Sequence, residues 1–294
     1  MADLAQSYLE EALAIIRAES VRRDLDWDDI CRDARERVSG DADLAACHAA
    51  IEELLAKVDR HSRLRLPSRA DDRAYPTVRE HPTVRRAGSI GILTLPSLAV
   101  VGPAANEYAT IAHRALAFAS DVEGWVVDLR ANSGGNMWPM LVAAGPVLGD
   151  GIAGAFVSPE GRRNEWGYAH GSAFLAGKPT VVGVDDPARM PQARPVAVLT
   201  SGATKSSGEA MAIAFRGRPA TRSFGAPTNG TPTANQLFRL SDGAVLVLTV
   251  SFMSDRTGRV YDEPIAPDVA LDPASAEAAA LAWLASAPAN PPAA

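Results

Sequence analysis

The chain has 294 residues, of which 47% are hydrophobic, so it is long enough to bury the core of one large domain or two modest ones. Its formal net charge of −6, with basic residues scattered along the sequence, argues against nucleic acid as a partner. No apolar run approaches the roughly 18 residues that span a membrane, and the first residues lack the basic and apolar segments of a signal peptide. We therefore expect a globular protein without a membrane anchor, located in the cytoplasm.

Two cysteines, Cys31 and Cys47, are too few for a disulfide framework and lack the spacing of metal ligands. Cys47 and His48 together could bind a metal, but packing inside a helical region explains a buried cysteine more simply. We expect no cofactor and no metal site. Nothing in the sequence indicates an oligomeric state.

Apolar residues recur at helical spacing between residues 3 and 58. They form three stripes: Leu4, Leu9, Leu13 and Ile16; Leu25, Trp27 and Ile30; Ile51, Leu54, Leu55 and Val58. Asp41 or Asp43 would cap the third helix. We predict a helical bundle over residues 1–65. Residues 66–87, rich in charge and proline, are expected to form a linking loop or short hairpin.

From residue 88 the pattern becomes an alternation of strands and helices. Residues 90–95 and 125–129 are predicted strands, and residues 104–119 a helix. The second strand leads into Gly134 and Gly135, and another helix begins near Trp138 or Pro139. This turn lacks the patterns of a phosphate-binding loop. It is suited to donating one backbone N–H to an oxyanion.

The remainder of the chain completes a predicted core over residues 88–286. Residues 150–190 are expected to be an inserted cap over a cleft, and residues 233–240 and 244–249 a hairpin. A helix is predicted over residues 273–285, and residues 287–294 are expected to be disordered. The fold class is therefore α/β (α+β), with an N-terminal helical bundle before the core.

Ser206 lies in the stretch that carries the most chemical information. Residues 196–199 are a predicted strand, residues 209–215 a helix, and Ser206 and Ser207 fall where that helix begins. Free backbone N–H groups at a helix start can stabilise an anion. Ser206 and Glu209 also have the S-x-x-E spacing of a capping box, which needs no function. The stretch alone leaves a helix cap and a nucleophile as alternatives.

Three motifs in this order resemble peptidase family S41, the family of C-terminal processing proteases and the tricorn core. They are VDLRANSGG at 127–135, TKSSGE at 204–209, and GAPTNG at 225–230 followed by IAPD at 265–268. The pattern is most similar to Ser-His members of the nisin-resistance type, which combine a helical bundle with the core and lack a PDZ domain. The resemblance implies a ClpP/crotonase-like ββα core, and it implies that Ser206 is the nucleophile.

The base differs from the lysine of the family's commonest form. In Ser-Lys members a lysine follows the GAPTNG-type turn, and here that position is Thr231. A serine hydroxyl needs a positioned base. Lys205 adjoins Ser206, but neighbouring residues at a helix end do not face each other. His61, in the sequence Asp-Arg-His-Ser at 59–62, resembles the histidine of the Ser-His members and is the expected base.

The resemblance also implies the surrounding groups. The N–H of Ser207, with that of Gly134 or Gly135, would form the oxyanion hole. Asp255, Asp262 and Glu263 are candidates for a third member that orients His61, each with a solvated surface carboxylate as its alternative. Substrate contacts are expected from Asn132, Asn136, Thr228, Asn229, Gly230 and Thr231.

The resemblance thus predicts a serine peptidase that hydrolyses peptide bonds in an extended peptide or C-terminal segment through a Ser206–His61 dyad and an acyl-enzyme. Two alternatives stay open. The same acyl-enzyme could be intercepted by an amine or alcohol, as in an acyl transferase or cyclase. The absence of lysine at position 231 also fits a non-catalytic homologue that binds a ligand.

Overall fold

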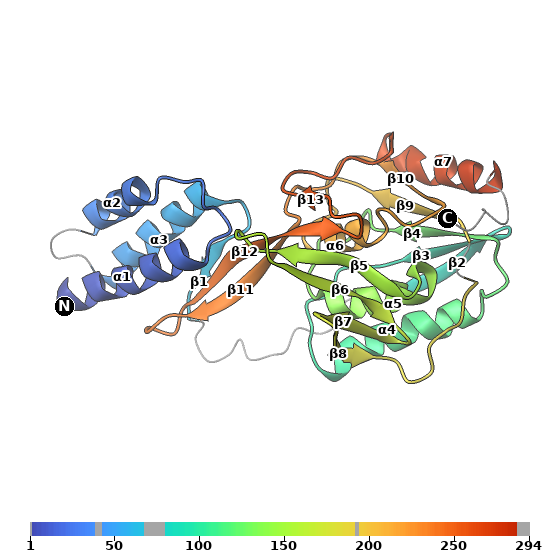
Figure 1. Cartoon of the computed structure of the whole chain (residues 1–294), viewed down its shortest axis with the longest axis horizontal. Coiled ribbons are helices and arrows are strands. Elements are labelled where there is room, and N and C mark those ends of the chain that lie inside the picture. The colour runs from blue at the N-terminus through green and yellow to red at the C-terminus, as the bar shows by residue number, and fades with distance from the viewer. Residues whose placement is uncertain (1, 39–42, 68–79, 192–193, 287–294) are drawn as a thin grey trace. The chain divides into compact units, whose positions relative to one another are not determined.

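The computed structural model describes residues 2–38, 43–67, 80–191 and 194–286, and the chain divides into two compact units (Figure 1). Unit 1 comprises Met1–Ala74, Val157–Arg162 and Thr233–Phe252; unit 2 comprises Tyr75–Phe156, Arg163–Pro232 and Met253–Ala294. Each unit buries a hydrophobic core of its own. The predicted tail, 287–294, and residues 68–79 of the predicted linker lie outside the described residues.

Unit 1 is built on three helices, a short strand and a hairpin. These are α1 (Ala2–Glu19), α2 (Trp27–Arg37), α3 (Leu44–Val58), β1 (Arg63–Arg65), β11 (Thr233–Arg239) and the first part of β12 (Val245–Asp255). The side chain of Asp43 accepts the N–H of Ala46 and caps α3, as predicted, whereas Asp41 lies outside the described residues. Asp26 caps α2 in the same way.

The hairpin of β11 and β12 shares the hydrophobic core of the three helices. Leu246 and Leu248 of β12 are fully buried together with Ile16 and Ile51 of the helices. The sequence predicted this hairpin but assigned it to the C-terminal core. The apolar face of β12 accounts for the difference, because a strand joins the core against which its apolar side chains are buried.

Unit 2 contains a six-stranded sheet. Its strand order is β14 (Val269–Ala270), β10 (Thr221–Gly225), β9 (Val196–Thr200), β4 (Gly124–Asp128), β3 (Ile90–Thr94) and β2 (Thr83–Ala87). All neighbours are parallel except β2 and β3. Residues 83–87, predicted as linker, are thus an edge strand that pairs with the strand that follows it.

Helices cover both faces of this sheet, which confirms the predicted α/β class (Figure 1). Val126 of β4 packs with α7 (Pro273–Ser286), whereas Val127 faces α4 (Pro103–Ala117), α5 (Met137–Leu148) and α6 (Ser207–Ala214). Successive side chains of a strand point to opposite faces, so a strand buried on both sides reads as a continuous apolar run. None of the described helices is both long enough and apolar enough to cross a membrane.

Residues 151–183 form strands of a second sheet in unit 2. They are β5 (Gly151–Val157), β6 (Arg163–Ala169), β7 (Ser172–Leu175) and β8 (Lys178–Gly183), in that order beside the end of β12, which also pairs with β13 (Val260–Tyr261). Trp166 and Tyr168 are buried in the core of unit 2. The stretch that the sequence indicated as an inserted cap is therefore part of the scaffold. Buried and exposed residues do not alternate strictly along these strands, so the sequence lacks the period-two pattern of a half-buried strand.

The register of β4 and β9 determines where the functional segments lie. The two strands are parallel neighbours, and Asp128 pairs with Leu199 near their carboxyl ends. The segments that follow them, one with the two glycines and one with Ser206, therefore leave the sheet at the same edge.

Candidate active site

The loop between β9 and α6 holds Ser206 in a strained backbone conformation. Ser206 has a φ of +53° and directly precedes Ser207, the first residue of α6. A non-glycine residue at such a φ costs about 1–3 kcal/mol and persists only where its surroundings hold it. A strained strand-to-helix turn is also how hydrolases of another fold expose a nucleophilic serine. Ser206 is partly exposed, whereas the helix that it precedes is buried.

Hydrogen bonds fix this loop to the segment that follows β4. The hydroxyl of Ser201 donates to the carbonyl of Arg130 at 2.6 Å, and that of Thr204 donates to the carbonyl of Leu129 at 2.9 Å. The N–H of Lys205 donates to the carbonyl of residue 132 at 3.0 Å. These bonds attach the loop along its length, from residue 201 to the residue before Ser206.

The two-glycine turn approaches Ser206 so closely that only glycine fits. Gly134 has a φ of +96°, and a Cβ on it would lie 2.7 Å from the carbonyl oxygen of Lys205 and 3.0 Å from Cβ of Ser206. The hydroxyl of Ser207 donates to the carbonyl of Gly135 at 2.7 Å. The structure thus brings together four residues that the sequence singled out: Ser206, Ser207, Gly134 and Gly135.

The two glycines differ in what their N–H groups can do. Gly134 is buried, and its N–H donates to Oδ1 of Asn132 at 2.9 Å. Gly135 is exposed, and its N–H makes no hydrogen bond to another described residue. The N–H of Ser207, at the first position of α6, has no acceptor within the helix. The geometry therefore favours Gly135 and Ser207 as the pair of oxyanion donors.

Asn132 is part of the scaffold of this turn. Its side chain has no exposed surface, and Nδ2 donates to the carbonyl of Leu95 at 2.9 Å. A side chain without exposed surface cannot contact a substrate, so that expectation is wrong for Asn132. Asn136 is partly exposed; its Oδ1 caps α5, and its Nδ2 donates to the carbonyl of Val100.

The turn at residues 228–231 is bound to Glu209 of α6. The carboxylate is fully buried and accepts hydrogen bonds from the hydroxyl of Thr228, the N–H of Gly230, and both the N–H and the hydroxyl of Thr231. Thr228 and Thr231 are themselves buried, so their side chains hold Glu209 instead of meeting a substrate as expected. Asn229 is partly exposed, and its N–H donates to the carbonyl of Thr204.

His61 lies in a well-fixed loop of unit 1. The carboxylate of Asp59 accepts the N–H of His61 at 2.7 Å and both the N–H and the hydroxyl of Ser62 at 2.6 Å. Nδ1 of His61 is 2.8 Å from the hydroxyl oxygen of Thr233 at the start of β11. The sequence contains no signal for Thr233, because the contact joins residues 172 positions apart.

The three acidic candidates for orienting His61 differ in burial. Asp262 and Glu263 are exposed, whereas Asp255 is buried and accepts hydrogen bonds from Thr257, from the N–H of Arg259 and from the hydroxyl of Tyr261. Burial alone would raise the pKa of Asp255, but these hydrogen bonds hold it below its usual range. Asp255 thus stabilises the turn that follows β12.

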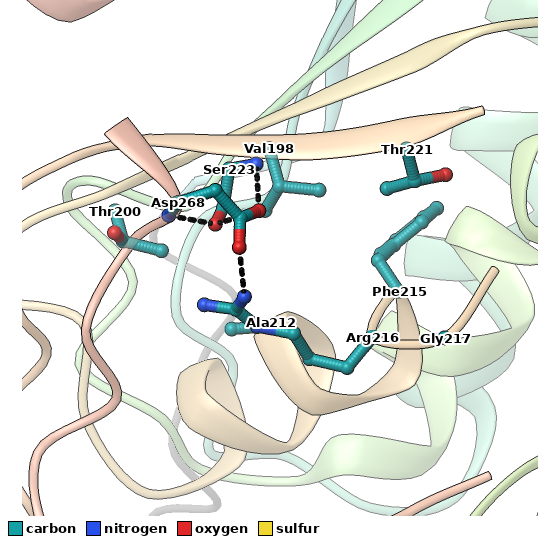
Figure 2. Close-up of a pocket in the computed structure, with 9 residues that line it drawn as sticks. All are labelled: Val198, Thr200, Ala212, Phe215, Arg216, Gly217, Thr221, Ser223 and Asp268. Atoms are coloured by element: carbon teal, nitrogen blue, oxygen red, sulfur yellow. Dashed lines mark hydrogen bonds and ion pairs between the residues drawn. The ribbon is translucent and has the colours of Figure 1, made fainter. Parts of the chain in front are cut away.

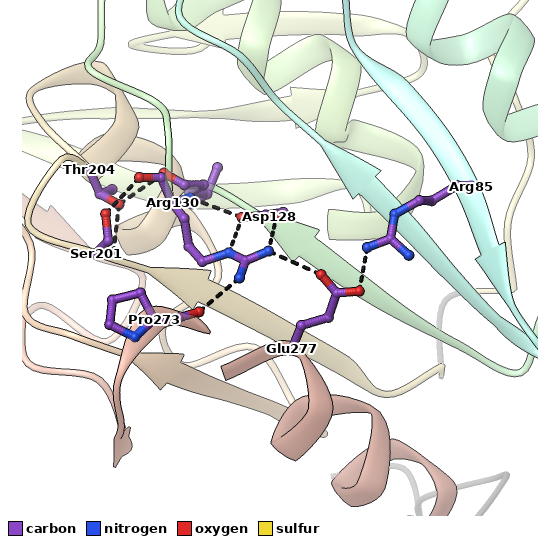
Figure 3. Close-up of polar contacts among 8 residues, drawn as sticks. Arg85, Asp128, Arg130, Ser201, Thr204, Pro273 and Glu277 are labelled. Carbon is purple, nitrogen blue, oxygen red and sulfur yellow. Dashed lines mark hydrogen bonds and ion pairs between the residues drawn. The ribbon is translucent and has the colours of Figure 1, made fainter. Parts of the chain in front are cut away.

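A network of charged side chains supports the segment that leads to the glycines (Figure 3). The guanidinium of Arg130 bonds to both carboxylate oxygens of Asp128, to Glu277 at 3.0 Å and to the carbonyl of Pro273 at 2.8 Å. Glu277 also pairs with Arg85 of β2. The network connects the end of β4 to α7, and its bonds to two carboxylates raise the pKa of Arg130.

A cavity of about 120 Å³ lies between α6 and strands β9 and β10 (Figure 2). Asp268, from the IAPD motif, lines it and accepts the N–H and hydroxyl of Ser223 at 2.7 Å and Nη1 of Arg216 at 2.6 Å. Neither Ser206 nor either glycine lines this cavity. Asp268 therefore fixes β10. Among the described residues, no group of three or more histidine, cysteine, aspartate or glutamate side chains could hold a metal ion.

Two of the predicted motifs meet at one end of the parallel sheet. Ser206 lies in a strained turn at the start of α6, and Gly134 of the turn after β4 approaches it closely. The chain belongs to peptidase family S41, whose sequence pattern matches residues 89–271. The predicted resemblance to this family is thereby confirmed.

Individual relatives agree with this assignment. The chain is 32% identical over 204 residues to the nisin-resistance protein of Lactococcus lactis subsp. lactis, and the match covers 69% of this chain and 62% of that protein. A lipoprotein from Streptococcus agalactiae has a TM-score of 0.76 at 22% identity over 96% of both chains. The photosystem II D1 C-terminal processing protease has a TM-score of 0.60 at 16% identity over 92% of this chain and 93% of its own. Both structures share the fold.

The expected cytoplasmic location is contradicted by these comparisons. The Streptococcus agalactiae structure that matches along 96% of each chain is that of a lipoprotein, and a lipid anchor attaches a protein to a membrane. The expectation of a cytoplasmic location rested on the first residues of the chain, and the comparison overturns it.

Proposed function

We propose that this protein hydrolyses peptide bonds with Ser206 as nucleophile, His61 as base, and the N–H groups of Ser207 and Gly135 as oxyanion donors. The observation that carries the proposal is the strained φ of Ser206 beside the glycine turn, in which Gly134 approaches Ser206 and Gly135 is exposed. Strained residues cluster at functional sites, and Ser206 is held both by the bond from its N–H to Glu209 and by the close approach of Gly134. A helix cap alone would need neither the strain nor the glycine turn.

The proposed reaction proceeds through an acyl-enzyme. Nε2 of His61 removes the proton from the Ser206 hydroxyl as its oxygen attacks the carbonyl carbon of the peptide bond. The resulting oxyanion accepts hydrogen bonds from the N–H groups of Ser207 and Gly135, each worth about 2.7–4 kcal/mol of barrier. The imidazolium then protonates the leaving amine, and water hydrolyses the acyl-enzyme with the same histidine as base.

Two features support His61 as the base. Thr231, at the position of the lysine in Ser-Lys members, is buried and donates its hydroxyl to Glu209, so this position offers no base. The hydroxyl of Thr233 can accept the N–H at Nδ1 of His61, which would leave Nε2 in the unprotonated form that a base requires. We therefore assign the orienting role to Thr233.

Labelling with a fluorophosphonate tests the proposal. The reagent should phosphonylate Ser206, identified by peptide mass spectrometry, and the label should vanish in Ser206→Ala and fall steeply in His61→Ala. Mass spectrometry of products formed with an added amine then separates hydrolysis from acyl transfer. A folded protein that stays unlabelled would refute the nucleophile, and undiminished labelling of His61→Ala would refute the base.

A further inference from the structure

The carboxylate of Glu209 makes far more hydrogen bonds than a helix cap requires. Oε2 accepts the N–H of Ser206 at 2.8 Å, the N–H of Thr231 at 2.9 Å and its hydroxyl at 3.0 Å. Oε1 accepts the hydroxyl of Thr228 at 2.6 Å and the N–H of Gly230 at 2.8 Å. A capping box uses only the first of these bonds. The other four attach the helix start to a turn about twenty residues further along the chain.

These five bonds explain how a carboxylate with no exposed surface is tolerated. The two oxygens of a carboxylate offer about four lone-pair sites, and here all of that capacity is used. The donors are neutral N–H and hydroxyl groups, and the start of α6 adds the positive end of its dipole. These hydrogen bonds and the helix dipole therefore stabilise the carboxylate, and a change at any donor would disturb the others.

One of these five bonds restrains the backbone of Ser206 directly. Its N–H is held by Glu209, the preceding N–H of Lys205 is held by the carbonyl of Asn132, and Gly134 packs against its Cβ. Of these restraints, only Glu209 also reaches the turn at residues 228–231. That turn is fixed from outside as well, because Pro264 packs on Gly230 and the N–H of Ile265 donates to the hydroxyl of Thr228.

We propose that Glu209 is a positioning residue for Ser206, which holds the strained nucleophile by coupling the start of α6 to the turn at residues 228–231. Thr231 contributes to this coupling, because it donates two of the five hydrogen bonds that Glu209 accepts. The turn thus acts as a support for the nucleophile. This proposal rests on the proposed role of Ser206, and its test has one measurement that requires no activity.

The main variant is Glu209→Gln, which keeps the shape of the side chain but turns one acceptor oxygen into an NH2 group that faces donors. Displacing a reacting group by about 1 Å can cost roughly 10²-fold in rate, so we expect the second-order rate constant of Ser206 labelling by a fluorophosphonate to fall by about that factor. Glu165→Gln, on an exposed strand residue of β6, is the matched control and should label at the unchanged rate.

A second pair of variants separates positioning from general stability. Thr231→Val removes the hydroxyl without changing the size of the side chain, and it should slow labelling by about tenfold, the effect of roughly one hydrogen bond to a charged group. Thr231→Ser restores the hydroxyl and should label within about twofold of the unaltered protein. Rates are measured well below the unfolding transition of each variant, so a merely structural role would leave them equal.

Amide hydrogen exchange supplies the measurement that needs no activity. In Glu209→Gln the N–H groups of Ser206, Gly230 and Thr231 should lose protection while those of β9 keep theirs. Retained protection at all three, or an unchanged labelling rate for Glu209→Gln, would overturn the proposal. If Ser206 of the unaltered protein is never labelled, the proposed function fails, and the exchange result still decides whether Glu209 couples the two segments.

Discussion

Replacing Gly134 by alanine tests the close approach of the glycine turn to Ser206. The new Cβ would lie 2.7 Å from the carbonyl oxygen of Lys205, 3.0 Å from Cβ of Ser206 and 3.1 Å from the nitrogen of Ser207. Ordinary contact needs about 3.5 Å or more between such atoms, so the Ser206 loop must move by several tenths of an ångström. The φ of +96° adds backbone strain.

The expected magnitudes follow from these two effects. Strain at positive φ costs about 1–3 kcal/mol, and overpacking adds about 1–3 kcal/mol to the loss of unfolding free energy. Displacement of Ser206 should slow fluorophosphonate labelling by about 10²-fold. Urea denaturation measures the first quantity, and the second-order labelling rate measures the second.

Gly258→Ala is a closely matched control. Gly258 has a φ of +97°, and a Cβ on it would meet nothing within 4 Å, so this variant carries the strain without the overlap. It should lose about 1–3 kcal/mol of unfolding free energy and keep its labelling rate. Equal stability losses and equal labelling rates for the two variants would refute the reasoning that Gly134 supports the nucleophile by close contact.

Two further predictions concern His61 and the acid stability of unit 2. Thr233→Val should slow labelling of Ser206 by about tenfold, because it removes the bond to Nδ1 of His61, and Thr233→Ser should keep the labelling rate. Equal labelling rates for Thr233→Val and Thr233→Ser would exclude an orienting hydroxyl. The pKa of Asp255 is depressed in the folded state, so its stabilisation is present above the unfolded value of about 3.9 and is lost as pH falls through the folded value. The difference in unfolding free energy between the unaltered protein and Asp255→Asn should therefore shrink below about pH 4, and a difference that is constant from pH 7 to pH 2 would contradict this assignment.

The side chains of the turn at residues 228–231 lie differently from what its motif predicts. The GAPTNG motif marked this turn as functional, and its proximity to Ser206 follows from the hydrogen bonds of Glu209. The sequence predicts that its side chains contact a substrate. In the structure Thr228 and Thr231 are buried and donate to Glu209 instead, because a buried carboxylate needs hydrogen-bond donors around it.

The S-x-x-E spacing of Ser206 and Glu209 leaves a helix cap and a nucleophile as alternatives for Ser206. The structure has the bond from the Ser206 N–H to Glu209 that the spacing predicts, together with a φ that an ordinary cap does not have. The two interpretations therefore describe one device, in which the cap glutamate holds the residue proposed as nucleophile.

The sequence by itself determined the helices of residues 3–58 and the membership of peptidase family S41. It also determined the two buried strands whose carboxyl ends are followed by the glycines and by Ser206. Each of these leaves a local signal, because apolar periodicity, glycine turns and motif spacing are properties of neighbouring residues. Only the tertiary structure decided that Gly135 and not Gly134 has an open N–H, that Thr233 contacts His61, and that Asn132 is buried. These facts depend on which groups already have partners, and those partners come from segments far apart in the sequence.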